Sequence, residues 1–575
     1  MRTSWTGIAG LVLVVGCPGP ERPASLDGLG ETETREDGDA DVRRDGNADG
    51  RADEARDDDG GEGSDGGGDG EDGDVACTPE RMCHADFPCD ISGSYYRPHC
   101  EGDVVMTPDN VPCWDARVCG TSCCEGGRCF LEATPCPAGL GCTDASGYPQ
   151  CVPGCWELAT FADSAVYLRT VHVAPYGDDE TGDGTEYNPY ATLQRAARDA
   201  LPGDSLALHP GMHAGDQRLE RLQGTEANPI RIGRWFPEYG GPDDAAVVSG
   251  GTEAIHLVDP RWVVIEDLEI NLQTSNGIVI ESGGAAAVPA DVVIRRVTMW
   301  GVGATGEGDF VKLSRADRVA VLDSQFGYWS DASAHGAAID MIGCRDALVA
   351  RNHFTGGGAF GVGASWTAVV QARGGSSEVT IARNRISDGG DRPLGLGGRT
   401  DPALLRPGAD YEARDIRAIG NVVLDSTGAI AFVGCDGCLA ANNTVVHPTG
   451  SPVRILQESV HGYVPCRAGR VVNNLVVFST ADVTELVEVG SGPEPGTFIF
   501  SHDLWFADDD PGFVPSLPVV ETGTVAADPR FVDAAGYDYH LAAGSPALGA
   551  GVAVLEVTAN ADGACPADPP NIGAY

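Results

Sequence analysis

Short segments in which apolar and polar residues alternate recur along most of the chain. Alternation with a period of two predicts β-strands rather than helices. The segments recur about every 29 residues from near Ser164, which is typical of a solenoid whose repeat is one coil of three short strands. We expect successive coils to stack at about 4.8 Å. The repeats align on nine equivalent positions: Leu268, Val297, Ser324, Asn352, Asn384, Asn421, Asn443, Asn474 and Asp503.

Five of these nine positions are asparagines, and they fall on successive coils. Such a column predicts a ladder in which each side-chain amide donates to the next and caps the backbone of a tight turn. Asparagine also tolerates the left-handed backbone conformation that tight turns require. The ladder therefore sets the register of the whole solenoid, and through it the side chains that become neighbours.

The same register predicts an inward-facing stack of small residues eight positions before the ladder. Cys435 and Cys466 would lie in this stack on adjacent coils, at a Cα separation that permits a disulfide bond. Stacked reduced thiols are the alternative. Cys435 and Cys438 also form a C-x-x-C motif, which we interpret as structural because it lies in a coil and not at the start of a helix. The predicted stack comprises Ala316, Cys344, Ser376, Ala413, Cys435 and Cys466.

The first 17 residues have the features of an export signal. Arg2 supplies a positive charge, and residues 8–15 form an apolar core too short to span a bilayer. The end of the segment resembles the bacterial lipobox, which implies acylation of Cys17; an ordinary cleavage site is the alternative. We therefore expect an exported protein, lipid-anchored to the outer membrane or cell surface.

Residues 18–76 form an acidic linker that we expect to be disordered. Between Asp27 and Asp74 there are 20 acidic residues and five arginines, with too few apolar residues to form a core. Asp45–Gly50 matches the first half of a calcium-binding loop, but Arg56 stands where the bidentate glutamate is needed. A solvated tether is the favoured interpretation of this segment.

Residues 77–160 form a cysteine-rich module, with thirteen cysteines between Cys77 and Cys155. In an exported protein this density predicts a disulfide framework around a small core. Zinc binding is a weaker alternative, because the spacings are irregular and His84 and His99 show no paired ligand pattern.

The net charge of the chain is −47, which disfavours nucleic acid as a partner because phosphate binding needs clustered basic residues. Arginine supplies every basic residue except Lys312. Codon bias in a GC-rich genome explains the general excess of arginine, so the position of this lysine is suggestive and no more.

Both ends of the 161–575 region resemble the secreted β-helix proteins of the pectate-lyase-like superfamily. The resemblance rests on VHVAPYGDDETGDGTEYNPYATLQRAARDALPGDSLALHPGMH at 171–213, on DPRFVDAAGYDYHLAAGSPALGAGV at 528–552, and on the final NIGAY. It implies an all-β right-handed parallel β-helix, with a helix from about Tyr190 to Ala200, capped by Asn188, covering the first coil. The first strand is expected at Ser205–His209.

In lyases of this superfamily, a strand face binds an acidic polysaccharide, a basic residue removes the proton next to a uronate carboxylate, and calcium or arginine stabilises the resulting charge. Counting twelve residues back from the ladder places Lys312, Asp340 and Ala372 on successive coils, with Arg373 one residue away. Lys312, Asp340 and Arg373 are therefore candidate catalytic residues. A cross-strand ion pair is the structural alternative for Lys312 and Asp340.

A second candidate cluster surrounds a long insertion at residues 400–411. Arg392 and Arg399 precede this insertion and complete the candidate catalytic set, while Glu412 and Arg414 end it as candidate substrate-binding residues. Arg454 and Gln457 precede a second insertion and extend the same set. The glycines between Arg392 and Arg399 have an alternative interpretation as a bulged turn.

These features predict a surface-anchored carbohydrate-active protein, and a polysaccharide lyase is the favoured enzyme. A glycoside hydrolase is the weaker enzymatic alternative. A non-catalytic polysaccharide binder or adhesin, and a structural surface protein, are the other candidates. The expected partner is a polysaccharide or cell-surface glycan, and membrane contact is expected only through the lipid anchor. Calcium is the candidate cofactor that the resemblance implies, although no residue set in the sequence identifies it.

Overall fold

The computed structural model describes residues 158–236, 245–284, 288–303, 308–327, 336–356, 368–459 and 462–575, together with short strands between His99 and Pro153. The predicted signal segment and acidic linker lie outside the described residues. Within the cysteine-rich module, β1 pairs with β2, β2 with β5, and β3 with β4, all antiparallel. The module strands are β1 (His99–Glu101), β2 (Val104–Met106), β3 (Cys124–Glu125), β4 (Arg128–Cys129), β5 (Thr134–Pro135), β6 (Leu140–Thr143) and β7 (Gln150–Pro153).

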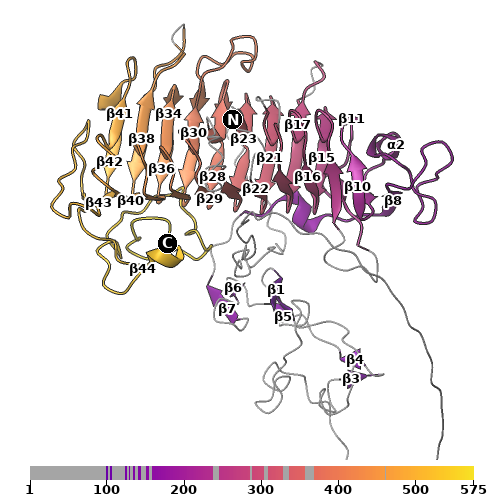
Figure 1. Cartoon of the computed structure of the whole chain (residues 1–575), viewed down its shortest axis with the longest axis horizontal. Coiled ribbons are helices and arrows are strands. Elements are labelled where there is room, and N and C mark those ends of the chain that lie inside the picture. Colours follow the sequence, from indigo (N-terminus) through magenta and orange to yellow (C-terminus); the bar gives the residue numbers. More distant parts are fainter. Residues whose placement is uncertain are drawn as a thin grey trace, which may run out of the picture. The chain divides into compact units, whose positions relative to one another are not determined.

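The region from residue 158 onward is a right-handed parallel β-helix, as the repeat predicts. Each coil contributes one strand to each of three long parallel sheets, and the coils follow one another in chain order along the long axis (Figure 1). The ten-stranded sheet contains β11 (Gln217–Glu220), β14 (Ile255–Val258), β17 (Ile278–Glu281), β20 (Val311–Ser314), β23 (Ala337–Ile342), β26 (Ala368–Arg373), β30 (Leu394–Gly397), β34 (Ile430–Val433), β38 (Val453–Leu456) and β41 (Val487–Val489).

The other two long sheets complete the three sides of the solenoid. The twelve-stranded sheet contains β8 (Arg169–Val173), β9 (Asp204–Leu208), β12 (Ile230–Arg234), β15 (Arg261–Glu266), β18 (Ala290–Arg295), β21 (Asp317–Leu322), β24 (Leu348–Ala350), β28 (Thr380–Ala382), β32 (Arg417–Ile419), β36 (Leu439–Ala441), β39 (Arg470–Val472) and β42 (Ile499–Ser501). The eleven-stranded sheet contains β10 (Gly211–Ala214), β13 (Ala246–Ser249), β16 (Glu269–Asn271), β19 (Thr298–Trp300), β22 (Gln325–Gly327), β25 (His353–Thr355), β29 (Arg385–Ser387), β33 (Val422–Leu424), β37 (Thr444–Val446), β40 (Leu475–Phe478) and β43 (Leu504–Ala507).

The predicted asparagine ladder is confirmed. The backbone N–H of Asn352 donates to Asn384 Oδ1 at 3.0 Å, and its side-chain amide donates to the same oxygen at 3.1 Å. The same pair of bonds repeats on each coil up to Asn474, which donates to Asp503 Oδ1. Every ladder asparagine is buried, so the ladder satisfies backbone groups that water cannot reach.

The left-handed backbone conformation lies one residue before the ladder and not on it. Arg351 and Arg383 have φ of 56° and 55°, and Asn442 and Asn473 occupy the equivalent positions of later coils with φ of 53° and 58°. The ladder asparagine instead keeps a conformation that points its amide inward. The expectation that the ladder residues themselves are left-handed is therefore wrong by one position.

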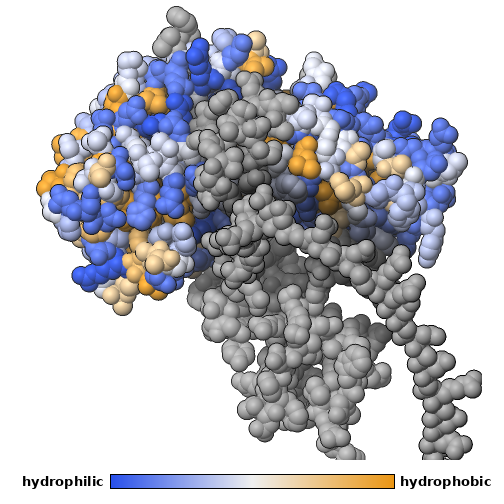
Figure 2. Space-filling model, viewed as in Figure 1, coloured by the Kyte–Doolittle hydropathy of each residue, from blue (hydrophilic) through white to orange (hydrophobic). Residues whose placement is uncertain are grey.

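The interior of the solenoid is an apolar core of aliphatic and aromatic stacks, including Phe326 stacked on Phe354. The predicted small-residue stack is confirmed, because Ser376 pairs with Ala413, and Ala413 with Cys435, in a short sheet of their own. Its strands are β27 (Ser376–Ser377), β31 (Ala413–Arg414) and β35 (Cys435–Asp436). The visible outer face is mostly hydrophilic, with apolar residues in small groups (Figure 2).

The first coil carries the predicted helix in a shorter form. Helix α2 (Leu193–Ala197) is capped by Thr192 and not by Asn188, because the Thr192 hydroxyl accepts from Arg195 N. The helix buries Leu193 against the first strands, and the strand that follows it is β9. Among the described residues, no helix is long and apolar enough to cross a membrane. The remaining elements are η2 (Phe161–Ser164), η4 (Pro495–Thr497), β44 (Phe531–Asp533), η5 (Ala534–Gly536) and β45 (Asp538–Leu541).

Candidate functional site

The outer face of the ten-stranded sheet carries a row of residues in register, most of them polar. Lys312 on β20 pairs with Asp340 on β23, as predicted, and Asp340 pairs with Gln371 on β26. The residues on either side of Lys312, Val311 and Leu313, point inward and are fully buried. The row continues in both directions along the sheet and comprises Arg218, His256, Val279, Lys312, Asp340, Gln371, Gly395, Ala431, Arg454 and Glu488.

Lys312 is paired with a carboxylate of its own coil. Its Nζ lies 3.3 Å from Oδ2 of Asp309, whose other oxygen accepts from the backbone N–H of Ala337 at 2.9 Å. The side chain of Lys312 is 36% exposed and that of Asp309 only 10%. Burial, followed by the charge of Asp340, raises the pKa of Asp309 to about 6. Asp309 was not among the predicted residues, although its position three residues before the only lysine is visible in the sequence.

Arg373, on the next coil, forms a bidentate ion pair with Asp340. Its Nε and Nη2 donate to the two carboxylate oxygens of Asp340 at 2.9 and 2.7 Å, and its Nη1 donates to Arg399 O at 2.9 Å. The side chain of Asp340 is only 3% exposed, against 21% for Arg373. The predicted register is wrong by one here: Ala372 pairs with Met341 and faces the core, and Arg373 reaches Asp340 through its long side chain.

Arg399 is the most available cation of the site. It is exposed, and its side chain makes no hydrogen bond or ion pair within the described residues. Its neighbours hold its backbone firmly, since Gly398 N donates to Val433 O and Thr400 N donates to Glu412 Oε1. Arg399 therefore presents a free guanidinium from a fixed position at the edge of the sheet.

A chain of hydrogen bonds joins Lys312 to the early coils. His256 bonds to Glu253 at 2.7 Å and to Glu281 at 2.9 Å, and the hydrogen bond to Glu253 raises the pKa of His256. Glu253 accepts from Asn276, which in turn accepts from Asp309 N. Sequence reasoning missed this chain, because Glu253, Asn276 and Asp309 lie in turns between strands and follow no single count from the ladder.

Arg392 and Arg454 belong to a separate ionic network. Arg392 Nη2 lies 2.6 Å from Glu458, and Arg454 lies 2.6 Å from Asp391 and 2.9 Å from Glu488. Arg392 precedes β30 whereas Arg399 follows it. Because the strands are parallel, the two arginines lie beyond opposite strand ends of the ten-stranded sheet. The structure therefore brings Lys312, Asp340, Arg373 and Arg399 into one region and leaves Arg392 outside it.

Glu412 and Gln457 tie the two insertions to the solenoid. Glu412 is fully buried and accepts from Gly374 N, Thr400 N, Thr400 Oγ1 and Ser459 Oγ, which leaves it unavailable to a ligand in this structure. Gln457 bonds to the backbone of Ser459 and of Cys466.

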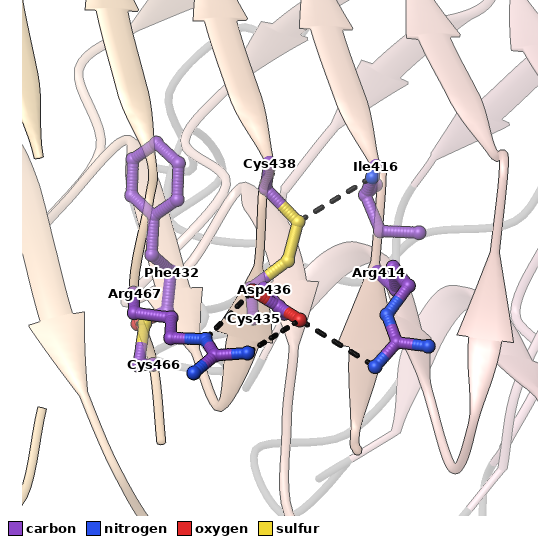
Figure 3. The surroundings of a disulfide bond; sticks show 8 residues. All are labelled: Arg414, Ile416, Phe432, Cys435, Asp436, Cys438, Cys466 and Arg467. Atoms are coloured by element: carbon purple, nitrogen blue, oxygen red, sulfur yellow. Dashed lines mark hydrogen bonds and ion pairs between the residues drawn. A yellow bond between two sulfur atoms is a disulfide. The ribbon is translucent and has the colours of Figure 1, made fainter. Parts of the chain in front are cut away.

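Arg414 stays on the outer surface, where its guanidinium lies 3.9 Å from the Tyr411 ring centroid and 3.4 Å from Asp436. It faces the turn beyond the ten-stranded sheet, beside the C-x-x-C motif (Figure 3). Its role as a substrate ligand stays a prediction.

The structure does not contain the predicted bond between Cys435 and Cys466. Cys435 is bonded to Cys438 within the same turn, with their Cα atoms 6.1 Å apart, and Cys466 is a free buried thiol on the adjacent coil (Figure 3). The bond within the C-x-x-C motif takes the partner that the inter-coil bond would have used, and the structural role of the motif stays an interpretation. Both partners lie within reach of Cys435, and the partner in the same turn holds the bond.

No group of three or more histidine, cysteine, aspartate or glutamate side chains is arranged to hold a metal ion in the part of the chain that the structure describes. The carboxylates on this face are already engaged: Asp309 with Lys312, Asp340 with Arg373, Glu253 and Glu281 with His256, and Glu488 with Arg454. These residues do not fit calcium, and no chemical step is assigned to it.

Comparison with known proteins gives the following picture. No family model matches the chain, and no curated protein matches it. Among solved structures, the pectate lyase Pel9A is similar at 14% identity and a TM-score of 0.41, covering 72% of this chain and 97% of that one. An alginate lyase from Paenibacillus sp. str. FPU-7 is similar at 13% identity and a TM-score of 0.36, covering 57% and 99%.

A GH136 lacto-N-biosidase from Eubacterium ramulus is similar at 15% identity and a TM-score of 0.31, covering 63% of this chain and 67% of that one. At these values the likeness carries no argument about activity. The fold assignment rests instead on the three parallel sheets and the ladder of the chain itself, which make it a parallel β-helix protein.

Proposed function

We propose that the protein is a lipid-anchored carbohydrate-active β-helix protein that binds an acidic polysaccharide along the ten-stranded sheet and cleaves it by β-elimination. The proposal rests on how the charged side chains of this face are arranged: the basic side chains lie outside and their acidic partners lie beneath them. Lys312 and Arg373 face solvent, while their partners Asp309 and Asp340 are buried behind them. A ligand approaching the sheet therefore meets cations first, although the chain as a whole is strongly acidic.

The arrangement assigns separate roles to the cations. In its neutral form, the Lys312 amine accepts the proton next to a uronate carboxylate and becomes an ammonium that Asp309, 3.3 Å away, stabilises. Arg373 stabilises the charge that develops on that carboxylate, because two of its five N–H groups remain free after its bonds to Asp340 and Arg399 O. The bidentate contact with Asp340 fixes the direction of the guanidinium.

Arg399 serves a different sugar of the same polymer. It follows β30, three coils beyond Lys312, and it lies four residues after Gly395, which is level with Lys312, so at the coil spacing of about 4.8 Å the two backbones are at least about 14 Å apart. This distance is too long for both side chains to act on one sugar. We assign Arg399 to binding a second carboxylate further along the chain, which makes the polymer, and not a single sugar, the ligand.

The test is release of unsaturated, ultraviolet-absorbing products from alginate, pectin and glycosaminoglycans, together with retention on the same polymers. Lys312→Gln is expected to lower the product rate at least about 100-fold, the scale of a lost general base, with retention preserved. Arg198→Gln is the matched control, because Arg198 is an exposed arginine at the end of α2, near the first strand of the sheet and three coils from the strand that carries Lys312.

Equal product rates from Lys312→Gln and the control would contradict the role of Lys312. Retention of the wild-type protein without any product would contradict catalysis and identify a polysaccharide binder. Absence of both product and retention would refute the polysaccharide proposal itself. Release of the protein from membranes after Cys17→Ser, compared with the wild type, tests the lipid anchor independently.

A further inference from the structure

Three cysteines lie close together at the turn between the ten- and twelve-stranded sheets, and two of them form a disulfide bond. Cys435 and Cys438 are bonded, while Cys466 stays reduced on the neighbouring coil. All three are buried, with exposures of 1%, 0% and 0%. The two coils are direct neighbours, because Arg467 N donates to Cys435 O and Arg470 N donates to Cys438 O, both at 2.9 Å.

The thiol of Cys466 is directed toward the coil that carries the disulfide. Its Sγ contacts Phe432 O at 3.6 Å, and Phe432 lies three residues before Cys435 on that coil. Asp436 and Arg467 form a parallel bridge, which places Cys435 and Cys466 at equivalent positions of the inward stack. Their Cα atoms are therefore about one coil spacing apart, within the range that a disulfide accepts. Figure 3 shows the three cysteines on the two adjacent coils.

We infer that Cys435 is a shared disulfide partner whose bond exchanges between Cys438 and Cys466. In the exchange, Cys466 is deprotonated when the turn opens transiently to solvent, and its sulfur attacks Sγ of Cys435. The bond from Cys435 to Cys466 forms as that from Cys435 to Cys438 breaks, and Cys438 takes up a proton. One disulfide and one thiol are present before and after, so no oxidant or reductant is consumed.

The two states differ in what the bond constrains. The bond to Cys438 closes one turn, whereas the bond to Cys466 staples two coils together across a much longer loop. Cys466 also lies within the second insertion, residues 458–470, where its backbone N–H donates to Gln457 at 2.7 Å, and Ser459 of that insertion donates to Glu412. Exchange therefore changes whether the second insertion, which borders the ten-stranded sheet, is covalently attached to the neighbouring coil. This holds whatever ligand the sheet binds.

The exchange is expected to be slow at neutral pH and faster in alkali. Burial raises the pKa of the Cys466 thiol to about 11, so the thiolate that attacks is rare near pH 7. Cys344 provides an internal reference in the same chain. It is a buried thiol of the same stack but lies three coils from Cys435, with Ser376 and Ala413 between them, and it cannot take part.

The experiment maps free thiols on the full-length exported protein. Native protein is held at pH 7 and at pH 9, quenched in acid and alkylated after denaturation, and its peptides are identified by mass spectrometry. Alkylation at Cys438 is expected to appear and to grow at pH 9 as alkylation at Cys466 falls, with Cys344 alkylated throughout. In Cys466→Ser, alkylation at Cys438 is expected to stay absent.

Cys438→Ser provides the second arm. Removal of Cys438 is expected to leave a bond between Cys435 and Cys466, so that among the three remaining cysteines from Cys344 to Cys466 only Cys344 is alkylated. Free Cys435 and Cys466 in the folded variant would overturn the inference. Should that variant fail to fold, the wild-type arm still decides: full alkylation of Cys466 with none of Cys438 after prolonged incubation at pH 9 would overturn it equally.

Discussion

Arg383 carries a buried positive charge that forms no salt bridge with the described residues, and its replacement is expected to stabilise the protein. The residue is 8% exposed, and its Nη1 has no hydrogen-bond partner. Burial, with a further contribution from Arg351, lowers the pKa of Arg383 from 12.5 to about 10. Its backbone is also left-handed, with φ of 55°, which disfavours residues with long side chains.

The magnitude follows from these two facts. At about 1.4 kcal/mol per pKa unit, holding the charge in the folded state costs about 3 kcal/mol at neutral pH. Asparagine at this position removes that cost and also relieves about 1 kcal/mol of backbone strain, as Asn442 and Asn473 do at the equivalent positions of later coils. The variant also loses the packing of the arginine stem, whose Cγ lies near Gly420, and this loss offsets about 1–2 kcal/mol of the gain in stability. Arg383→Asn is therefore expected to raise the free energy of unfolding by about 2 kcal/mol.

The pH dependence gives a second check. Since the folded pKa of Arg383 is lower than the unfolded pKa, the unfolded chain binds more protons only above about pH 10. The cost is fully present at every lower pH, so the gain from Arg383→Asn is expected to be constant between pH 5 and pH 9. Thermal unfolding followed by circular dichroism across this range measures it.

Arg351→Asn is the matched control on the preceding coil. Arg351 has the same left-handed backbone, but it donates to both oxygens of Asp323 at 2.6 and 2.7 Å. Its replacement breaks a bidentate ion pair and is expected to bring no gain. Equal loss of stability in both variants would refute the reasoning, because it would mean that Arg383 has a counter-charge comparable to Asp323.

Two further predictions concern the ladder and its end. Asn443→Ala removes the acceptor of Asn421 and the donor to Ala418 O inside the core. It is expected to lower the free energy of unfolding by about 3 kcal/mol, measured by chemical denaturation. The control is Asn228→Ala, at an exposed turn, which is expected to lower it by less than about 1 kcal/mol. Asp503 ends the ladder fully buried, and burial followed by Glu521 raises its pKa well above the ordinary value. The unfolded chain then loses this proton first, so stability falls as the pH rises above about 4, and Asp503→Asn is expected to raise the melting temperature at pH 7 but not at pH 4. A gain of equal size at both pH values would contradict the assignment.

The fold could be predicted from the sequence because the coils of a β-helix repeat at a nearly constant spacing, and this spacing can be counted along the chain. The ladder asparagines appear about every 29 residues, and the position eight residues before them gives the small-residue stack that the structure confirms. Counting also brought Lys312 beside Asp340. It failed at Ala372, because the turn after Arg373 contains Gly374 and Gly375, both with positive φ, and the coil gains a residue there.

The partners within the site could not be counted in the same way. Asp309, Glu253 and Asn276 lie in turns, where the chain leaves the regular spacing, and their contacts depend on how each turn folds back. The choice between Cys438 and Cys466 as partner of Cys435 was open for a related reason. One partner is close in sequence and the other is close through the register, and both satisfy the geometry of a disulfide.

The charge of the site shows why composition is a poor guide to the ligand of a solenoid. A net charge of −47 argues against a polyanion only if acidic side chains face the ligand. On the ten-stranded sheet, Asp309 and Asp340 lie behind Lys312 and Arg373, and Arg399 has no acidic partner among the described residues. A buried carboxylate both neutralises and orients the cation in front of it, so the acidic residues here help to build a cationic surface. An acidic polysaccharide is therefore compatible with this acidic protein, provided that it follows the line of coils from Lys312 to Arg399.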